Sequence, residues 1–250
     1  MRTLGILGGM SWERTAVYYR RLLPPSITAV NCRLLNQGVA RRLGGLHSAS
    51  LRLHSVDFAP IAALQAAGHW DQAADLLSQA ALGLQRAGAQ GLLLATNTMH
   101  LVADRIEATS GLPLLHIADA TGAALQTAGL QQVALLGTRF TMDDERIVRA
   151  RLQQRYGLAV SVPDAEDRTL MHRVIYEELC RGLMTTESRD AVVAIIDRQR
   201  QQGAQAVILG CTEIGLLIDA ACSPLPVFDT TVLHAAAAVD WMLELEGNTR

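Results

Sequence analysis

The residues best suited to chemistry are a threonine and a cysteine at matching positions of an internal repeat. Residues 88–98 (GAQGLLLATNT) align with residues 203–213 (GAQAVILGCTE), which sets Thr96 against Cys211. Upstream, 4–9 resembles 133–138, and a Leu-Pro pair follows each copy in the same order. Both residues come directly after a short apolar run. We therefore expect both at the carboxyl ends of buried strands, where α/β proteins bind ligands.

A thiol and a hydroxyl can each carry a proton to or from a carbon atom. If the two halves face each other about a pseudo-twofold axis, Thr96 and Cys211 approach one cleft from opposite sides. This is the arrangement of a two-base racemase, and the carbanion it forms needs fixed hydrogen-bond donors. Cys211 is the better base, because a helix beginning after each strand end would lower the pKa of its thiol. The candidate donors are the hydroxyls of Thr98, Thr138, Thr141 and Thr212.

Short apolar runs alternate with amphipathic stretches along the chain, which predicts parallel strands covered by helices. We expect strands over 3–7, 50–56, 91–95, 114–117, 132–136, 159–162, 206–209 and 225–228. Helices are expected over 12–23, 70–86, 142–156, 168–181, 188–202 and 231–245. Two more begin at about Met99 and near Asp119, and Asp71 is the expected N-cap of the helix over 70–86. The predicted fold class is α/β, with two similar domains related by a pseudo-twofold axis and the active site between them. Their limits are 1–119 and 120–229, and the C-terminal helix 230–250 packs back on the first domain.

Composition excludes several classes of protein. The chain has 250 residues, of which 50% are hydrophobic and 18% charged, with a net charge of −2. This balance argues against a nucleic-acid partner, and no apolar run is long enough to span a membrane. The apolar stretch at the N-terminus is short and broken by glycines, so we expect a cytoplasmic protein.

All 22 basic residues are arginine, which excludes mechanisms that need a protein lysine, including pyridoxal phosphate chemistry. The four cysteines and seven histidines show no metal-ligand spacing, so no metal or cofactor is expected.

At three motifs the chain resembles the aspartate/glutamate racemase superfamily. They are the segments 5–12 (GILGGMSW), 96–100 (TNTMH) and 210–214 (GCTEI). Relatives usually carry cysteine at both catalytic positions, so Thr96 points to the L-aspartate/glutamate-specific subgroup with its Thr/Cys pair. Glu213 stands where cell-wall glutamate racemases have histidine, which disfavours that branch.

The resemblance implies cofactor-independent racemisation of a small amino acid by a homodimer, with Thr96 and Cys211 catalytic. Together with the strand-end positions it gives the candidate substrate-binding residues Met10, Ser11, His54, Asn97, Thr98, Thr138, Thr141, Thr212 and Glu213.

Two departures from the subgroup affect this interpretation. Pro24–Asn36 is an apparent insertion, expected at the cleft entrance or at dimer contacts. Relatives carry a lysine that holds the distal carboxylate of the substrate, and Leu170 occupies the matching position here. Arg168, His172 and Arg173 are the candidates to replace that lysine.

Other functions fit parts of the same pattern. Hydantoin racemase, maleate isomerase and arylmalonate decarboxylase belong to the same superfamily, and the decarboxylases resemble a one-cysteine version of this cleft. The residues of the 96–100 and 211–214 motifs favour the racemase subgroup over them. A non-catalytic protein that binds small acids would also have two α/β lobes around a cleft. Exchange of the α-proton of L-aspartate in D₂O separates this last alternative from an enzyme.

Overall fold

The computed structural model describes residues 1–10 and 30–244. The chain folds into two compact units and passes between them more than once. The first unit comprises Met1–Ala95, Leu101–His116 and His234–Arg250, and the second comprises Thr96–His100 and Ile117–Leu233. The domain limits drawn from the repeat stay a prediction.

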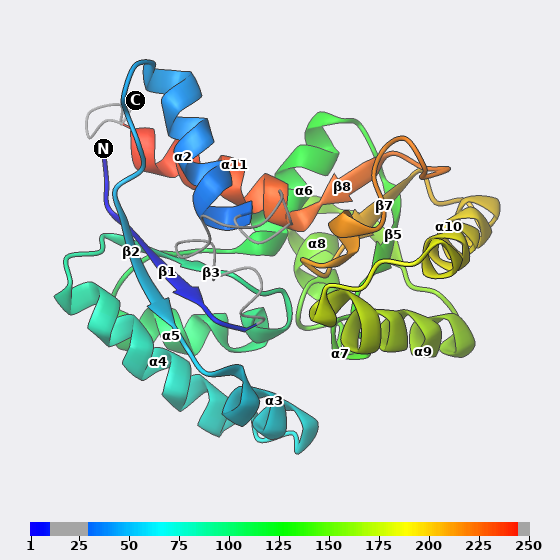
Figure 1. Cartoon of the computed structure of the whole chain (residues 1–250), viewed down its shortest axis with the longest axis horizontal. Helices are drawn as coiled ribbons and strands as arrows, with labels where there is room; N and C mark the ends of the chain where they lie inside the picture. Colours follow the sequence, from blue (N-terminus) through cyan, green and yellow to red (C-terminus); the bar gives the residue numbers. More distant parts are fainter. Residues whose placement is uncertain (11–29, 245–250) are drawn as a thin grey trace. The chain divides into compact units, whose positions relative to one another are not determined.

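The first unit is built on a four-stranded parallel sheet in the order β2-β1-β3-β4 (Figure 1). Its strands are β1 (Leu4–Gly8), β2 (Leu51–Ser55), β3 (Gly91–Leu94) and β4 (Leu114–Leu115). Its helices are α2 (Val30–Leu43), α3 (Phe58–Ala66), α4 (Trp70–Arg86) and α5 (Ala103–Ser110), together with most of α11 (Thr230–Leu243). All residues of β1 and β3 are buried, as expected for central strands with both faces covered.

The second unit repeats this topology with the order β6-β5-β7-β8. Its strands are β5 (Gln132–Leu136), β6 (Ala159–Ser161), β7 (Ala206–Leu209) and β8 (Val227–Asp229). Its helices are α6 (Ile117–Thr127), α7 (Arg139–Asp143), α8 (Arg149–Tyr156), α9 (Ala165–Arg173) and α10 (Thr186–Gln201). The predicted α/β class, with two similar parallel sheets flanked by helices, is thereby confirmed.

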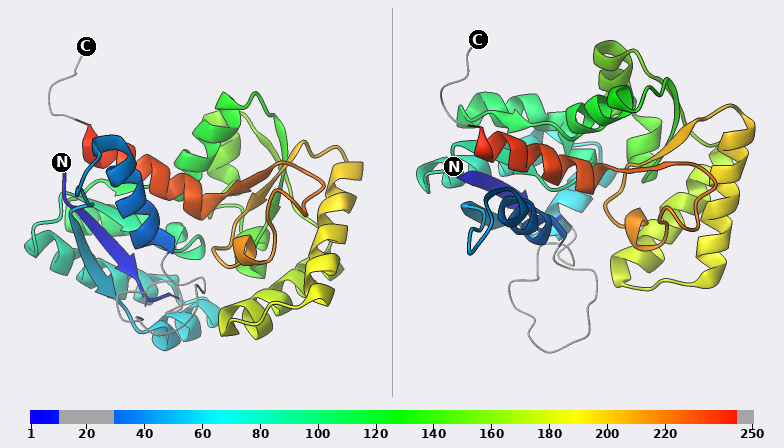
Figure 2. Two further views of the ribbon diagram at one scale, coloured as in Figure 1. Left: turned by 45° about the horizontal axis from the view of Figure 1, so that its top comes forward. Right: turned by 90° about the horizontal axis from the view of Figure 1, so that it is seen from above.

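Each sheet packs against an apolar helix surface. In the first unit, α2 and α11 lie side by side in both views of Figure 2, and Leu35, Val39 and Ala238 share a core cluster with Leu4 and Leu93. Gly38 permits this approach, since an added Cβ would lie 2.7 Å from Val239. In the second unit, a larger cluster joins β5 and β7 to α9 and α10.

Several predicted elements differ in detail. The helix expected over 142–156 is two helices, because Asp144 has an extended backbone and ends α7. The helix expected over 168–181 continues from α9 as a π-helical turn, Val174–Glu178, and a short 3₁₀ turn. The strand expected over 114–117 has only two residues, and Ile117 begins α6. Helices α2 and α3 were not predicted, and the helix expected over 12–23 lies outside the described residues.

The capping prediction for α4 was wrong. His69 occupies the N-cap position without a side-chain cap hydrogen bond, and Asp71 lies in the first turn. The Asp71 carboxylate accepts a hydrogen bond of 3.1 Å from Arg105 on α5. Asp71 therefore joins two neighbouring helices and does not begin one.

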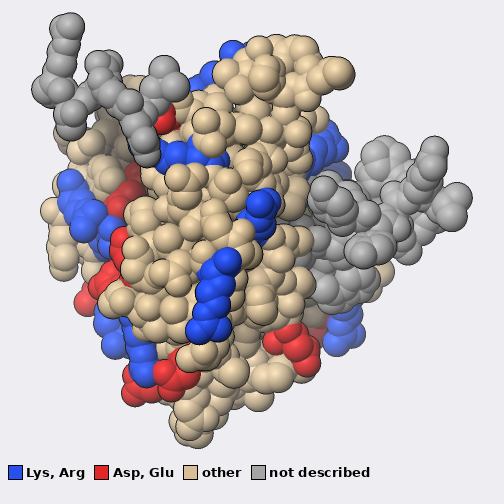
Figure 3. Space-filling view, turned by 90° about the vertical axis from the view of Figure 1, so that its left-hand side faces the viewer, with Lys and Arg blue, Asp and Glu red and all other residues tan. Residues whose placement is uncertain are grey.

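Figure 3 shows one face of the first unit, on which basic and acidic side chains are scattered among uncharged residues. Among the described residues, no helix is both long and apolar enough to cross a membrane.

His234 on α11 ties that helix to the edge of the first sheet. Its side chain is buried, and Nε2 lies 2.7 Å from the carbonyl oxygen of Leu115, so Nε2 carries the proton and donates. Burial lowers the pKa of His234 to about 4, because the charged imidazolium would lose its hydration.

We expect the pKa of His234 to make the stability of the protein depend on pH. The unfolded chain takes up the proton near the ordinary histidine pKa and the folded protein only near 4, so stability is lost as pH falls through this window. The loss between pH 7 and pH 4 is about 3 kcal/mol. Urea unfolding of the wild type and of His234→Gln at both pH values measures it. The glutamine amide keeps a donor for Leu115 but does not titrate, so an equal loss in both proteins would contradict the assignment.

Candidate functional site

The segment Thr96–His100 follows β3 and is held by a buried histidine. His100 Nε2 accepts a hydrogen bond of 3.2 Å from the backbone N–H of Ile117. Nδ1 therefore carries the ring proton and donates to the Thr96 carbonyl oxygen at 2.7 Å. His100 was not among the predicted site residues, although it lies within the same motif. It fixes the backbone of Thr96.

Cys211 lies directly beyond β7, beside the end of β5. Gly210 donates a backbone hydrogen bond of 2.6 Å to Leu136, the last residue of β5. A Cβ on Gly210 would lie 2.6 Å from the Leu135 side chain and 3.0 Å from the Leu136 oxygen, so only glycine fits. The glycine before Cys211 thus lets the two strand ends meet.

Three of the predicted hydrogen-bond donors form one chain of hydroxyl groups. The Thr141 hydroxyl lies 3.2 Å from that of Thr98 and 3.2 Å from that of Thr138. Thr138 also caps α7 by accepting from the backbone N–H of Thr141. All three side chains are buried, so this chain joins the segment after β3 to the end of β5.

Asn97 joins the same segment to β7 and α11. Its Nδ2 donates at 3.1 Å to the Thr230 hydroxyl, which donates at 2.8 Å to the carbonyl oxygen of Leu209. Asn97 Oδ1 is buried and has no hydrogen-bond partner within the described part of the chain. Among these residues, that oxygen therefore retains unused capacity to accept a hydrogen bond. Neither Thr230 nor this relay was predicted from the sequence.

Cys211 is hydrogen-bonded to an acidic neighbour. Its Sγ donates to Glu213 Oε2 at 2.9 Å, and the Thr212 hydroxyl donates to the same oxygen at 2.7 Å. Cys211, Thr212 and Glu213 are respectively 9%, 8% and 4% exposed. These contacts connect Thr212 and Glu213 to the thiol, and the substrate contacts expected for them stay predictions.

The pKa of Cys211 lies well above its usual range, contrary to the sequence-based expectation. Burial is the main cause, followed by the negative charge of Glu213 and by Cys180. The expected helix is also absent: the described residues after Cys211 form only a three-residue 3₁₀ turn, Ile214–Leu216. The segment after Thr96 likewise begins as the 3₁₀ helix Thr98–Val102. Short 3₁₀ turns lack the dipole of a longer helix. A hydrogen bond from the backbone N–H of Glu213 lowers the pKa of the thiol, but this effect is smaller than that of burial.

Tyr176 is a further ionisable group beside the thiol. It packs against the apolar cluster that contains Cys211, and its own pKa is raised to about 12 by burial and then by Cys211, Cys180 and Glu213. Its ring lies 4.5 Å from that of His172. Tyr176 belongs to the π-helical turn, a distortion that is frequent at functional sites. No sequence signal marks this residue, because the helical pattern is continuous there.

Three candidate residues lie elsewhere in the chain. Met10 and His54 belong to the first unit, where Met10 is buried and His54 is exposed on β2. Ser11 lies outside the described residues. The glycine turn before Met10 has a structural role. Gly9 has a φ of +94°, and a Cβ there would lie 2.1 Å from the Val56 oxygen, so the turn requires glycine.

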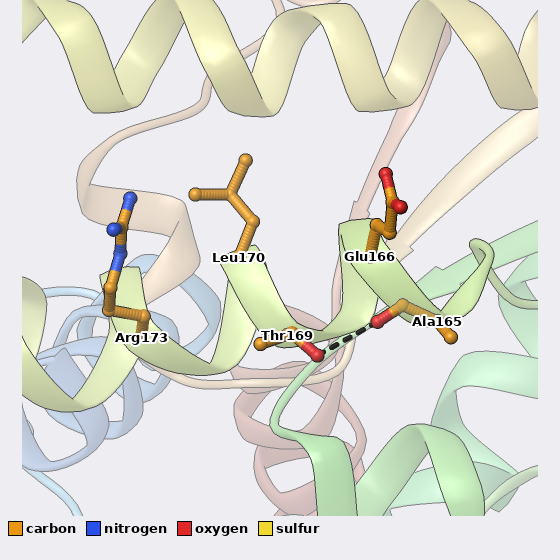
Figure 4. Close-up of a pocket in the computed structure, with 5 residues that line it drawn as sticks. All are labelled: Ala165, Glu166, Thr169, Leu170 and Arg173. Carbon is orange, nitrogen blue, oxygen red and sulfur yellow. Dashed lines mark hydrogen bonds between the residues drawn. The ribbon is translucent and has the colours of Figure 1, made fainter.

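Leu170, at the position of the missing lysine, lines a surface hollow of about 490 Å³ on α9. In Figure 4, Glu166, Leu170 and Arg173 project from one side of the helix, while the Thr169 hydroxyl bonds to the backbone of Ala165. Of the three basic candidates, Arg168 pairs with Asp143 at 3.3 Å, and His172 accepts from the backbone N–H of Arg139. Arg173 is exposed and forms no ion pair with the described residues.

The apparent insertion falls only partly on described residues. Residues 24–29 lie outside them, and Val30–Asn36 forms the first half of α2. Within this half, Leu35 is fully buried in the core of the first unit. The expected role at a cleft entrance or at dimer contacts stays a prediction.

Among the described residues, no group of three or more His, Cys, Asp or Glu side chains is arranged to hold a metal ion.

The Asp/Glu/hydantoin racemase family matches residues 7–238. The chain belongs to this family. Racemases are isomerases, which places the protein in that class of enzyme.

Solved structures support the assignment. A putative Asp/Glu racemase from Yersinia pestis is 50% identical, with 98% of this chain and 100% of that chain covered and a TM-score of 0.86. An aspartate racemase homologue from Pyrococcus horikoshii is 30% identical, with coverage of 98% and 100% and a TM-score of 0.78. Aspartate racemase from Picrophilus torridus is 19% identical, with coverage of 97% and 94% and a TM-score of 0.72, and so supports the fold alone.

We expect His100→Leu to destabilise the protein. Leucine fills a similar volume but leaves the Thr96 carbonyl and the Ile117 N–H without partners. At about 1–3 kcal/mol for each of the two buried groups, the free energy of unfolding should fall by about 2–6 kcal/mol. Chemical denaturation measures the change, with His47→Leu as the control because His47 is exposed. Equal stability of the two variants would show that His100 does not anchor the segment.

Proposed function

We propose that this racemase-family protein interconverts the L and D forms of aspartate or glutamate without a cofactor, by two-base proton transfer at the α-carbon. Cys211 and Thr96 are the two groups that move the proton. The resemblance of Thr96 and Cys211 to the L-specific subgroup supports the further assignment that Cys211 faces the α-proton of the L-substrate.

The main support for this proposal is the location of the two groups. Thr96 and Cys211 each lie just beyond the end of a buried parallel strand, β3 and β7 respectively. Thr96 and Cys211 belong to the same compact unit, although 115 positions separate them (211 − 96). The hydroxyl chain through Thr98, Thr141 and Thr138 joins the segment of Thr96 to the end of β5. The segment of Cys211 meets the same strand end through the hydrogen bond from Gly210 to Leu136. The Thr96 hydroxyl itself makes no hydrogen bond within the described residues and is only partly buried, so it remains available to a substrate.

The surrounding groups suit the intermediate of such a reaction. Loss of the α-proton spreads negative charge onto the α-carboxylate, and fixed donors must stabilise that charge. The hydroxyl chain is already positioned for this task and needs no reorganisation at the moment of reaction. Asn97 Oδ1, which has no hydrogen-bond partner among the described residues, is an acceptor that suits the α-ammonium group of an amino acid. Removing one hydrogen-bond donor that stabilises such a developing charge typically raises the activation barrier by about 2.7–4 kcal/mol.

The two groups have unequal acidities, and this predicts different behaviour of two alanine variants. In Thr96→Ala, Cys211 still removes and returns the α-proton of the L-substrate, so deuterium enters L-aspartate in D₂O without formation of the D form. In Cys211→Ala, both deuterium entry and racemisation are lost. Proton NMR follows the exchange, and polarimetry or chiral chromatography follows the inversion.

Controls separate chemistry from folding and binding. Circular dichroism verifies that both variants are folded, and L-glutamate is tested beside L-aspartate to establish the preferred substrate. Near-wild-type racemisation by Cys211→Ala would exclude the two-base mechanism. Absence of any α-proton exchange by the wild type with either amino acid would favour a non-catalytic binding protein.

The direction of the reaction provides a second test. The equilibrium constant of racemisation is one, so kcat/KM is equal for the two enantiomers and any asymmetry appears in kcat and KM separately. With a weakly acidic hydroxyl on one face, we expect a higher kcat for the L-substrate. Thr96→Cys makes the faces more alike and should bring the two kcat values together. Equal wild-type values that do not change in the variant would show that Thr96 is not one of the two groups.

A further inference from the structure

We propose that Glu213 is a positioning residue that holds the proton of Cys211, accepting it on Oε2 when the thiolate forms. This inference rests on the proposed function, in which Cys211 removes the α-proton. It gives Glu213 a role that the resemblance to known racemases did not assign, because the sequence analysis placed this residue against the substrate.

The contacts around Oε2 make Glu213 a partner of the thiol. Sγ of Cys211 lies 2.9 Å away, and the Thr212 hydroxyl holds the same oxygen at 2.7 Å. Two backbone hydrogen bonds, from Ile214 to the oxygen of Cys211 and from Leu216 to that of Glu213, fix the turn that carries both side chains. The carboxylate therefore stays aimed at the sulfur.

A role as substrate ligand suits Glu213 poorly. The side chain is 4% exposed, and the substrates proposed here carry two carboxylates. With the α-ammonium group included, the net charge of these substrates is −1, so a buried carboxylate repels them on balance, whereas it attracts the proton of a neighbouring thiol. Its location therefore favours proton exchange with Cys211 over recognition of an acidic amino acid.

The surroundings of Cys211 explain why a proton acceptor is needed. The sulfur lies in an apolar cluster. Among the described residues, the other ionisable groups that act on it are Cys180 and Tyr176, and neither supplies a positive charge. His172, whose ring is tilted by 41° against that of Tyr176, has its pKa lowered by burial and by Arg139 and so favours the neutral form. A thiolate formed by loss of the proton to solvent would leave two negative charges side by side. Transfer to Glu213 leaves only one.

Atoms and charges balance when the proton moves within the pair of Cys211 and Glu213. The S–H bond of Cys211 breaks while an O–H bond forms on Glu213 Oε2, giving a thiolate and a carboxylic acid with the same total charge of −1. The thiolate then takes the α-proton, so an S–H bond forms, the C–H bond breaks, and the electron pair remains on the substrate. Exchange with water returns Glu213 to its carboxylate form.

Glu213→Gln tests this role, because it should move two properties in opposite directions. Loss of the neighbouring negative charge lowers the pKa of Cys211, so alkylation by iodoacetamide becomes faster at neutral pH. Loss of the proton acceptor slows racemisation, by a factor on the order of 10² if Glu213 contributes as general bases usually do. A purely structural contact would not produce a more reactive thiol together with a slower enzyme.

Absorbance at 240 nm against pH, corrected with Cys211→Ala, measures the ionisation of the thiol in the full-length protein. Glu145→Gln is the matched control, since Glu145 is exposed and should leave both readouts unchanged. Glu213→Asp retains a carboxylate and should keep a thiol titration closer to that of the wild type, with part of the activity. If the glutamine variant does not fold, Glu213→Asp still tests whether a carboxylate at this position controls the ionisation of Cys211.

The outcomes distinguish this inference from the proposed function. An unchanged thiol titration in folded Glu213→Gln, or unchanged racemisation, would overturn the role of Glu213. Racemisation that survives in Cys211→Ala would instead overturn the proposed function. Because the thiol titration does not depend on turnover, it reports on the pair in either case.

Discussion

The candidate site depends on how a short segment after β3 is bound to strand ends that are distant in sequence. Residues 96–100 follow a strand of the first unit, but His100, Asn97 and Thr98 each hydrogen-bond to elements of the second unit. Each of these side chains is buried, so breaking a contact leaves a polar group without a partner. The position of Thr96 is therefore set by the second unit, although the strand before it belongs to the first.

The second constraint is the burial of Cys211. The strand ends meet because Gly210 has no side chain, and this close approach places the thiol in an apolar environment with little access to water. Such a site raises the pKa of a thiol, and the short 3₁₀ turn that follows cannot compensate. The same burial strengthens every electrostatic interaction at the sulfur, including the one with Glu213. A site of this kind holds its proton tightly at rest and depends on an immediate neighbour to release it.

The sequence predicted the sheets well because buried parallel strands have a simple apolar signature. Gln132–Leu136 and Ala206–Leu209 agree with the structure at both ends, as does the helix Trp70–Arg86. Breaks inside helices were missed, because the extended backbone at Asp144 and the π-helical turn at Val174 do not interrupt the amphipathic pattern. The pairing of Cys211 with Glu213 was missed for another reason: adjacent positions in a sequence do not reveal which side chains face each other. The contact of Asn97 with Thr230 depends on folding over 133 positions and has no local signal.

The repeat finally shows how one topology supports unequal chemistry at its two strand ends. The alignment sets Thr96 against Cys211, Asn97 against Thr212 and Thr98 against Glu213. In the second copy, the third residue is an acid that bonds back to the first, whereas in the first copy it is a threonine that bonds to Thr141 instead. Cys211 thus has a carboxylate beside it, and Thr96 has none within its own turn. In the proposed reaction of the L form, the thiol that must lose its proton before it can act as a base has a local proton acceptor. The Thr96 hydroxyl gives its proton to the carbanion and regains one from water. The difference between the two copies therefore lies in the third residue as well as in the first.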